Sequence, residues 1–167
     1  RLNICDEVVT FLVNCFMNLS ESLVRGQTYG FMRSSFLTLS NIILLLKFVD
    51  LNKKHKKLAV VSNKPHEFAE DVVKKYFGDI FAITYGQRPD HPTKPDPKTV
   101  FEVMESLKVD KSECIYVGDS DVDVNTAKNA EVKSVGVAWG FRGAGELREA
   151  GADYIIEEPS ELITLVI

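Results

Sequence analysis

Short apolar runs alternate with longer amphipathic stretches from residue 58 to the end of the chain. Residues 58–62 form a β-branched run that predicts a buried strand, and Pro65 favours a helix that continues to about residue 77. The same pattern predicts strands at 81–85, 114–118, 134–138 and 153–156, and helices at 97–107, 124–130, 145–150 and 160–166. Strands separated by single helices indicate right-handed crossovers, so we expect an α/β fold with one parallel sheet.

The first fifty residues show a different pattern. They contain half of the ten phenylalanines and none of the six prolines, and residues 8–23 and 38–49 are apolar with loose helical spacing. We therefore expect two parts, a short helical segment at 1–50 and an α/β core at 58–167. Because the chain begins with Arg1 rather than Met, we also expect a fragment, a processed product or an incomplete gene model.

Composition places the chain among folded proteins rather than disordered ones. Hydrophobic residues make up 45% of the 167 residues and charged residues 26%, which is enough apolar material for a buried core. The net charge of −4 leaves no basic excess for nucleic acid, and no apolar run approaches the roughly 20 residues that span a membrane. The three cysteines, Cys5, Cys15 and Cys114, have no close pairing and indicate a reduced, cytoplasmic protein with Cys114 in its core. None of these features indicates an oligomeric state.

The residues that follow each predicted strand are the first candidates for a site, because parallel sheets bind ligands at the carboxyl ends of their strands. The first strand is followed by Ser62, Asn63 and Pro65, where a hydroxyl and free backbone amides at a helix N-terminus can bind an anion. The second is followed by Lys94, a compact cation suited to a phosphate oxygen, whose backbone is restricted by the prolines at 95 and 97. Taken singly, a helix-capping serine and a solvated surface lysine are the commoner explanations.

The next predicted strand ends in an acidic loop. Gly118 allows a tight turn, and Asp119, Asp121 and Asp123 place three carboxylates within five residues, which is costly without a cation. Oxygen ligands suit Mg²⁺ or Ca²⁺. An EF-hand loop starting at Asp119 would need Gly and Glu at its sixth and twelfth positions, where this chain has Val and Ala. We therefore expect Mg²⁺, with a solvated acidic turn as the alternative. A hydroxyl, a lysine and an acidic cluster at successive strand ends together predict a phosphate-binding pocket.

The residues at these strand ends form three motifs. They are Val61-Ser62-Asn63-Lys64-Pro65, Lys94-Pro95-Asp96-Pro97 and Tyr116-Val117-Gly118-Asp119-Ser120-x-x-Asp123. These stretches resemble the second, third and fourth motifs of haloacid-dehalogenase (HAD) superfamily phosphatases. Two further stretches are similar, more narrowly, to phosphoglycolate phosphatases: Asn125-Thr-Ala-Lys-Asn-Ala130 and Val137-Ala-Trp-Gly-Phe-Arg142. The resemblance runs from about residue 58 to the C-terminus and implies a Rossmann-like three-layer core.

This resemblance implies a Mg²⁺-dependent phosphatase that acts on a small phosphorylated metabolite, with phosphoglycolate as the leading candidate. Lys94 and Ser62 would be its catalytic residues. Ser62 would bind the phosphoryl group through its hydroxyl, with help from the Asn63 backbone amide, and Lys94 would hold the nucleophile and the phosphate together. Asp119 would ligate Mg²⁺ directly, and Asp123 would ligate it or orient its water.

The family's first motif, Asp-x-Asp-Gly-Thr, has no counterpart before Ser62. In the family, its first aspartate attacks phosphorus to form an aspartyl-phosphate, and its second protonates the leaving group. Here neither Asp6 nor Asp50 is flanked by a predicted strand or followed by Gly-Thr. The sequence therefore predicts an incomplete core without its central strand and nucleophile, and an inactive or impaired chain. Residues 1–50 are then a candidate remnant of the helical cap that the family places between its first two motifs.

Other functions stay open at this point. The same residues could bind Mg²⁺ and phosphate without turnover, as a regulatory module. A phosphomutase or a pyrophosphatase of the same superfamily is also compatible with the motifs, because the cap selects the substrate. A phospho-acceptor receiver domain uses carboxylates, a hydroxyl and a lysine too, but there the acidic residues come first, whereas Lys94 precedes Asp119 here.

Overall fold

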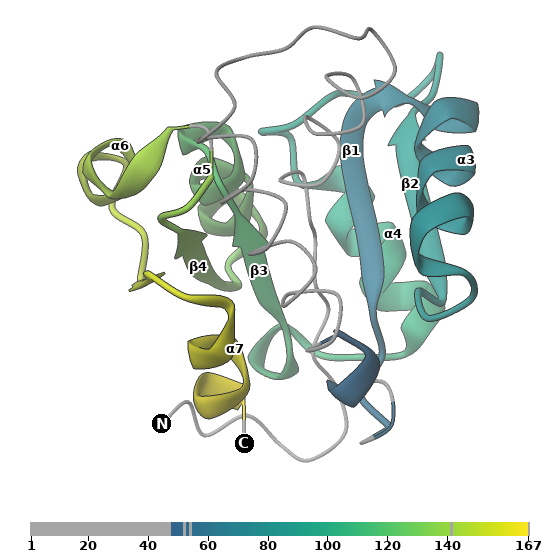
Figure 1. Ribbon diagram of the computed structural model, residues 1–167. Coiled ribbons are helices and arrows are strands. Elements are labelled where there is room, and N and C mark those ends of the chain that lie inside the picture. Colours follow the sequence, from purple (N-terminus) through teal and green to yellow (C-terminus); the bar gives the residue numbers. More distant parts are fainter. Residues whose placement is uncertain (1–47, 52, 54, 141, 167) are drawn as a thin grey trace, which may run out of the picture.

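The computed structural model describes residues 48–51, 53, 55–140 and 142–166. In chain order, its elements are β1 (Ala59–Pro65), α3 (His66–Phe77), β2 (Ile83–Gln87), α4 (Lys98–Leu107), the 3-10 helix η1 (Lys111–Glu113), β3 (Ile115–Gly118), α5 (Asp121–Ala130), β4 (Lys133–Val137), α6 (Gly143–Glu149), β5 (Tyr154–Ile156) and α7 (Pro159–Val166). Figure 1 shows the strands running between helices, with α3 beside β1 and β2.

All described strand pairs are parallel, as the alternation of strands and helices predicts. β1 pairs with β2, and β3, β4 and β5 form a second sheet in that order. Among the described residues, β1 and β3 share no hydrogen-bonded ladder. The single sheet expected from the sequence is therefore present as two parallel sheets (Figure 1).

Alternate residues of β1 and β3 belong to two different hydrophobic clusters. Val60, Ile115 and Val117 contribute to one cluster, together with residues of α3 and α7. Val61 and Tyr116 contribute to the other, together with residues of α4 and α5. Because successive side chains of a strand point to opposite faces, each cluster covers one face of both sheets. The strands thus lie between two helical layers, which is the three-layer arrangement expected.

Every strand and helix predicted after residue 58 is present, and no boundary moves by more than three residues. β1 continues through Pro65, which pairs with Gln87 after an irregularity in the ladder. Cys114 is buried in the core, as predicted. The helix predicted at 8–23 and nearly all of the one predicted at 38–49 lie outside the described residues. No helix in the described part of the chain is long and apolar enough to cross a membrane.

The acidic stretch after β3 is the start of a helix rather than the loop expected from the sequence. Ser120 is the N-cap of α5, and its Oγ accepts a hydrogen bond from the backbone N–H of Asp123 at 3.4 Å. Asp121 and Asp123 occupy the first turn of α5, where the helix dipole stabilises carboxylates. Helix geometry therefore orients two of the three carboxylates, while Asp119 directly follows β3.

Candidate functional site

The carboxyl ends of β1 and β3 bring most of the predicted site residues together. Ser62 and Asn63 lie in β1, Lys94 lies in the loop between β2 and α4, Asp119 follows β3, and Asp123 is in the first turn of α5. Hydrogen bonds join Lys94 to both Asn63 and Asp123, and the backbone N–H of Asp119 to Asp123. Four of the five predicted residues thus form one connected network.

Ser62 is adjacent to this network but does not join it through its side chain. Its Oγ accepts a hydrogen bond from the backbone N–H of Lys64 at 3.2 Å, which is a local turn typical of serine. Among the described residues, no hydrogen bond connects the Ser62 side chain to Lys94, Asp119 or Asp123. Ser62 is nevertheless only 4% exposed, so its hydroxyl lies within the protein beside the site.

The centre of the site is a buried ion pair. Lys94 Nζ lies 2.6 Å from Asp123 Oδ1, and the two side chains are 2% and 1% exposed. The other carboxylate oxygen, Asp123 Oδ2, accepts hydrogen bonds from Ser120 Oγ at 2.7 Å and from Asp119 N at 3.3 Å. Buried charges are tolerated when they are paired and hydrogen-bonded. These donors therefore explain how Asp123 can hold the lysine in the interior.

Tyr116 is a further buried neighbour of the Lys94–Asp123 pair. Its hydroxyl lies 3.5 Å from Asp123 Oδ1, and Lys94 Nζ lies 6.0 Å from the centre of its ring. Burial, and next the neighbouring Asp123 charge, raise the pKa of Tyr116 well above its ordinary value. The phenol is therefore neutral at physiological pH and contributes a weak donor rather than a third charge.

Two glycines allow the backbone to come close to the two carboxylates. A Cβ at Gly118 would lie 2.2 Å from Asp123 Cβ, and a Cβ at Gly140 would lie 2.2 Å from Asp119 Cβ. Both distances are too short for any other residue type without movement of the aspartate. The close approach of Gly140 also shows that the loop after β4 reaches the carboxyl end of β3.

Asp119 and Asp123 offer the oxygen ligands that Mg²⁺ prefers, although they do not form a complete cage. Both oxygens of Asp123 already accept hydrogen bonds from protein groups. Within the described ranges, no group of three or more His, Cys, Asp or Glu side chains is placed to hold a metal ion. Mg²⁺ needs only one or two carboxylates beside phosphate and water, so Asp119 is the residue to test as a direct ligand.

Neither Ser120 nor Gly140 was predicted from the sequence to have a role in the site. A serine three residues before an aspartate at a helix start is a capping signal, and that signal identifies Ser120. The contact between Gly140 and Asp119 joins loops that are distant in the sequence, so no local sequence pattern predicts it.

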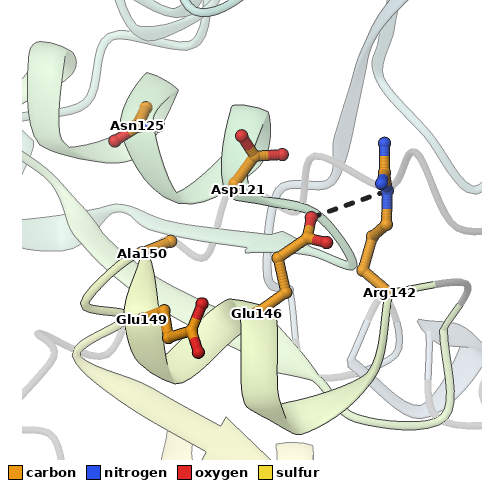
Figure 2. Close-up of a pocket in the computed structure, with 6 residues that line it drawn as sticks. All are labelled: Asp121, Asn125, Arg142, Glu146, Glu149 and Ala150. Atoms are coloured by element: carbon orange, nitrogen blue, oxygen red, sulfur yellow. Dashed lines mark ion pairs between the residues drawn. The ribbon is translucent and has the colours of Figure 1, made fainter.

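A separate open pocket lies between α5 and α6 (Figure 2). It has a volume of about 390 Å³ and is lined by Asp121, Asn125, Arg142, Glu146, Glu149 and Ala150. In Figure 2, Glu146 points toward Arg142, with Glu146 Oε1 and Arg142 Nε 3.5 Å apart. None of the predicted site residues lines this pocket. The candidate site is therefore defined by the buried ion pair and not by the pocket.

Fold and site together define an α/β protein with a buried polar network at the carboxyl ends of its parallel strands. The profile of the haloacid dehalogenase-like hydrolase family matches residues 38–137. The chain belongs to this family, which confirms the resemblance inferred from the three motifs and the Rossmann-like fold.

Individual relatives agree with this assignment. A Clostridium perfringens protein named as a candidate pyrophosphatase, PpaX, is 32% identical over 160 residues, or 93% of this chain and 68% of that protein. A phosphoglycolate phosphatase of Vibrio vulnificus is 30% identical over 111 residues, or 66% of this chain and 49% of that protein. A crystal structure from Lactobacillus delbrueckii subsp. bulgaricus, described as a candidate phosphoglycolate phosphatase, is 34% identical with a TM-score of 0.72, and the match covers 75% of this chain and 52% of that one. The chain spans about half the length of most of the curated relatives that it matches.

Proposed function

We propose that the full-length parent of this chain is a Mg²⁺-dependent hydrolase of small phosphomonoesters that works through an aspartyl-phosphate. The observation that carries this proposal is the buried Lys94–Asp123 pair beside Asp119, at the carboxyl ends of parallel strands. A lysine fixed at such an edge is suited to hold a phosphoryl oxygen. Membership of a hydrolase family supports the reaction type.

Each site residue has a distinct part in this proposal. Lys94 and Ser62 are the catalytic residues: the ammonium keeps phosphate and nucleophile together, and the hydroxyl binds a second phosphoryl oxygen beside the Asn63 backbone amide. Asp119 ligates Mg²⁺, which neutralises charge on the phosphoryl group when it is bound. Asp123 orients Lys94 and acts on the ion indirectly, because both of its oxygens accept protein hydrogen bonds.

The nucleophile is the part that we propose this chain does not supply. No Asp-x-Asp precedes Ser62. The described strands β1 and β3 are not joined by hydrogen bonds, although their sheets share two hydrophobic clusters. That break supports a missing central strand between them. In this proposal, residues 1–50 are a remnant of the cap, and the chain alone binds phosphate and Mg²⁺ without turnover.

Two further candidates have specific observations in their favour. The C. perfringens relative is named as a candidate pyrophosphatase, so inorganic pyrophosphate is the substrate to test after phosphoglycolate, which the name of the V. vulnificus relative specifies. A non-catalytic module that binds phosphate and Mg²⁺ is favoured by the lack of an Asp-x-Asp before Ser62. In either case the three cysteines, an odd number with no close pairing along the sequence, support a reduced, cytoplasmic setting.

The deciding experiment measures phosphate release by this chain from phosphoglycolate, pyrophosphate and an aryl phosphate, with and without Mg²⁺. We expect no release above that of Asp119→Asn, together with calorimetric binding of Mg²⁺ and inorganic phosphate that Asp119→Asn weakens. Mg²⁺-dependent release that this substitution abolishes would instead identify another carboxylate, Asp6 or Asp50 first, as the nucleophile. Equal Mg²⁺ affinity in the two forms would remove Asp119 from the metal site.

A further inference from the structure

Asn63 holds the backbone of Lys94 from the end of β1. Asn63 Oδ1 accepts a hydrogen bond from Lys94 N at 2.8 Å, and Asn63 Nδ2 donates to the Lys94 carbonyl oxygen at 3.1 Å. A side-chain amide has one acceptor and two donors, so it can bond both backbone groups of a single residue. This pairing fixes the position and the orientation of Lys94 at the same time.

A second asparagine holds the next residue from the opposite side. Asn129 Nδ2, near the end of α5, donates to the Pro95 carbonyl oxygen at 2.8 Å. Proline has no N–H, so this carbonyl is its only backbone hydrogen-bonding group. Asn63 belongs to β1 in one sheet, whereas α5 packs on β3 and β4 of the other. The two amides therefore hold consecutive loop residues from both sheets.

Lys94 needs such support because no helix or strand places it. It lies in the loop between β2 and α4, and a lysine side chain has about 2 kcal/mol of rotamer entropy to lose on ordering. Its ammonium nevertheless meets Asp123 at 2.6 Å with the side chain only 2% exposed. Functional groups keep a productive geometry when contacts behind them fix their position.

We propose that Asn63 and Asn129 are positioning residues that set where the Lys94 ammonium lies, and thereby how the site meets a phosphoryl oxygen. The effect on phosphate binding rests on the proposed function, because it requires that Lys94 contacts a phosphoryl oxygen. The proposal gives the Asn63 side chain a role that is separate from its backbone amide. Asn63→Ala removes the side-chain amide and keeps the backbone amide, so the two roles can be tested apart.

We call Asn63 and Asn129 together the clamp on Lys94. Acetylation of lysine amines in the full chain tests this clamp without any substrate. Limiting acetic anhydride is applied to each variant, and labelling at individual lysines is read by peptide mass spectrometry, with the exposed Lys75 as the reference. Lys94 and Lys56 are both buried, at 6% and 7% exposure, so global opening raises the labelling of both, whereas loss of the clamp raises only Lys94. Asn125→Ala is the matched control, because it removes an amide one turn before Asn129 that lines the separate pocket.

We expect Asn63→Ala, which removes two hydrogen bonds, to raise the labelling rate of Lys94 about tenfold relative to Lys56. Asn129→Ala removes one hydrogen bond and should raise this rate about threefold. Asn125→Ala should leave the ratio unchanged. Unchanged Lys94 labelling in Asn63→Ala, or a parallel rise at Lys56, would overturn the clamp. The expected labelling pattern in a chain that binds no inorganic phosphate with Mg²⁺ would support the clamp and refute only the phosphate-binding function.

Discussion

Two lysine–aspartate pairs in this chain have nearly the same geometry and opposite surroundings. Lys94 Nζ lies 2.6 Å from Asp123 Oδ1, and Lys133 Nζ lies 2.7 Å from Asp153 Oδ1. A serine hydroxyl donates to the second oxygen of each aspartate, at 2.7 Å in the first pair and 2.8 Å in the second. The side chains of the first pair are 2% and 1% exposed, against 57% and 30% for the second.

The two pairs also lie at opposite ends of one parallel sheet. Asp123 follows the carboxyl end of β3, whereas Lys133 begins β4 and Asp153 immediately precedes β5. Ligands of parallel sheets bind at the carboxyl ends of the strands, where Asp123 lies. An exposed pair contributes little to stability because water solvates both charges, while a buried pair cannot lose one partner without leaving an unpaired charge. Burial and position, more than residue type, therefore separate a candidate site from a surface contact.

Removal of the buried lysine should give the largest effect. In Lys94→Met, the Asp123 carboxylate loses its cation at a position that is 1% exposed, and an unpaired buried charge costs about 3–5 kcal/mol. Urea unfolding, followed through the fluorescence of the single tryptophan, Trp139, measures the change. An unfolding midpoint equal to that of the native chain would show that the pair is not required.

The matched control neutralises both partners of the buried pair. Lys94→Met combined with Asp123→Asn has no unpaired charge, so it should recover part of the lost free energy of unfolding. If the double variant were no more stable than Lys94→Met alone, the unpaired charge of Asp123 would not explain the loss.

A methyl group at Gly118 should disturb the buried pair without changing any charge. A Cβ there would lie 2.2 Å from Asp123 Cβ and 2.7 Å from its Oδ2, so the aspartate must move. We expect Gly118→Ala to cost about 1–3 kcal/mol and to increase acetylation of Lys94. Gly145→Ala is the control, because nothing lies within 4 Å of a Cβ at that position. Equal stability of the two variants would mean that Gly118 does not hold the carboxylate in place.

The elements and the rough location of the site were predictable because both leave local signals. β-branched runs and helical spacing predicted each strand and α-helix after residue 58, but not the short 3-10 helix η1. Lys94, Asp119 and Asp123 were selected because they follow predicted strands, and parallel strands bring such residues to one edge. The structure places these three residues in one hydrogen-bonded network. Their roles toward phosphate and Mg²⁺ stay predictions.

The contacts that connect those residues were not predictable, because they join distant segments. Asn63 was selected for its backbone amide, whereas the structure shows its side chain bonded to Lys94, 31 residues away. The acidic stretch was expected to be a loop because its charges obscured the capping signal of Ser120, and helix α5 begins directly after that residue. The break between β1 and β3 differs from these contacts, because the missing first motif already predicted a core without its central strand, and the two described strands share no hydrogen-bonded ladder.

Acid should weaken the exposed pair through Asp153. Burial alone raises the pKa of Asp153, but hydrogen bonds from Lys133 and Ser134 outweigh it and hold the pKa below that of an ordinary aspartate. A carboxyl with a lowered folded-state pKa stabilises the fold above its unfolded pKa of about 4, and this contribution is lost as the pH falls through the folded value. Asp153→Asn should therefore cost about 1 kcal/mol at neutral pH, with a smaller difference below about pH 4. Urea unfolding of the native chain and of Asp153→Asn, from neutral pH to below about pH 4, measures this difference in stability. A difference that does not change with pH would contradict the lowered pKa of Asp153.

Removal of the exposed lysine should give the smallest effect, and it is the direct counterpart of Lys94→Met. Lys133 is 57% exposed, so water can solvate Asp153 in Lys133→Met, and the backbone N–H and hydroxyl of Ser134 still donate to that carboxylate. We expect an unfolding midpoint close to that of the native chain, with any difference reduced further by added salt. The measurement is urea unfolding at low and high salt, with Lys94→Met in parallel. If both variants lost the same stability, burial would not distinguish the two pairs. The stability data would then give no reason to place the functional site at Lys94 rather than at Lys133.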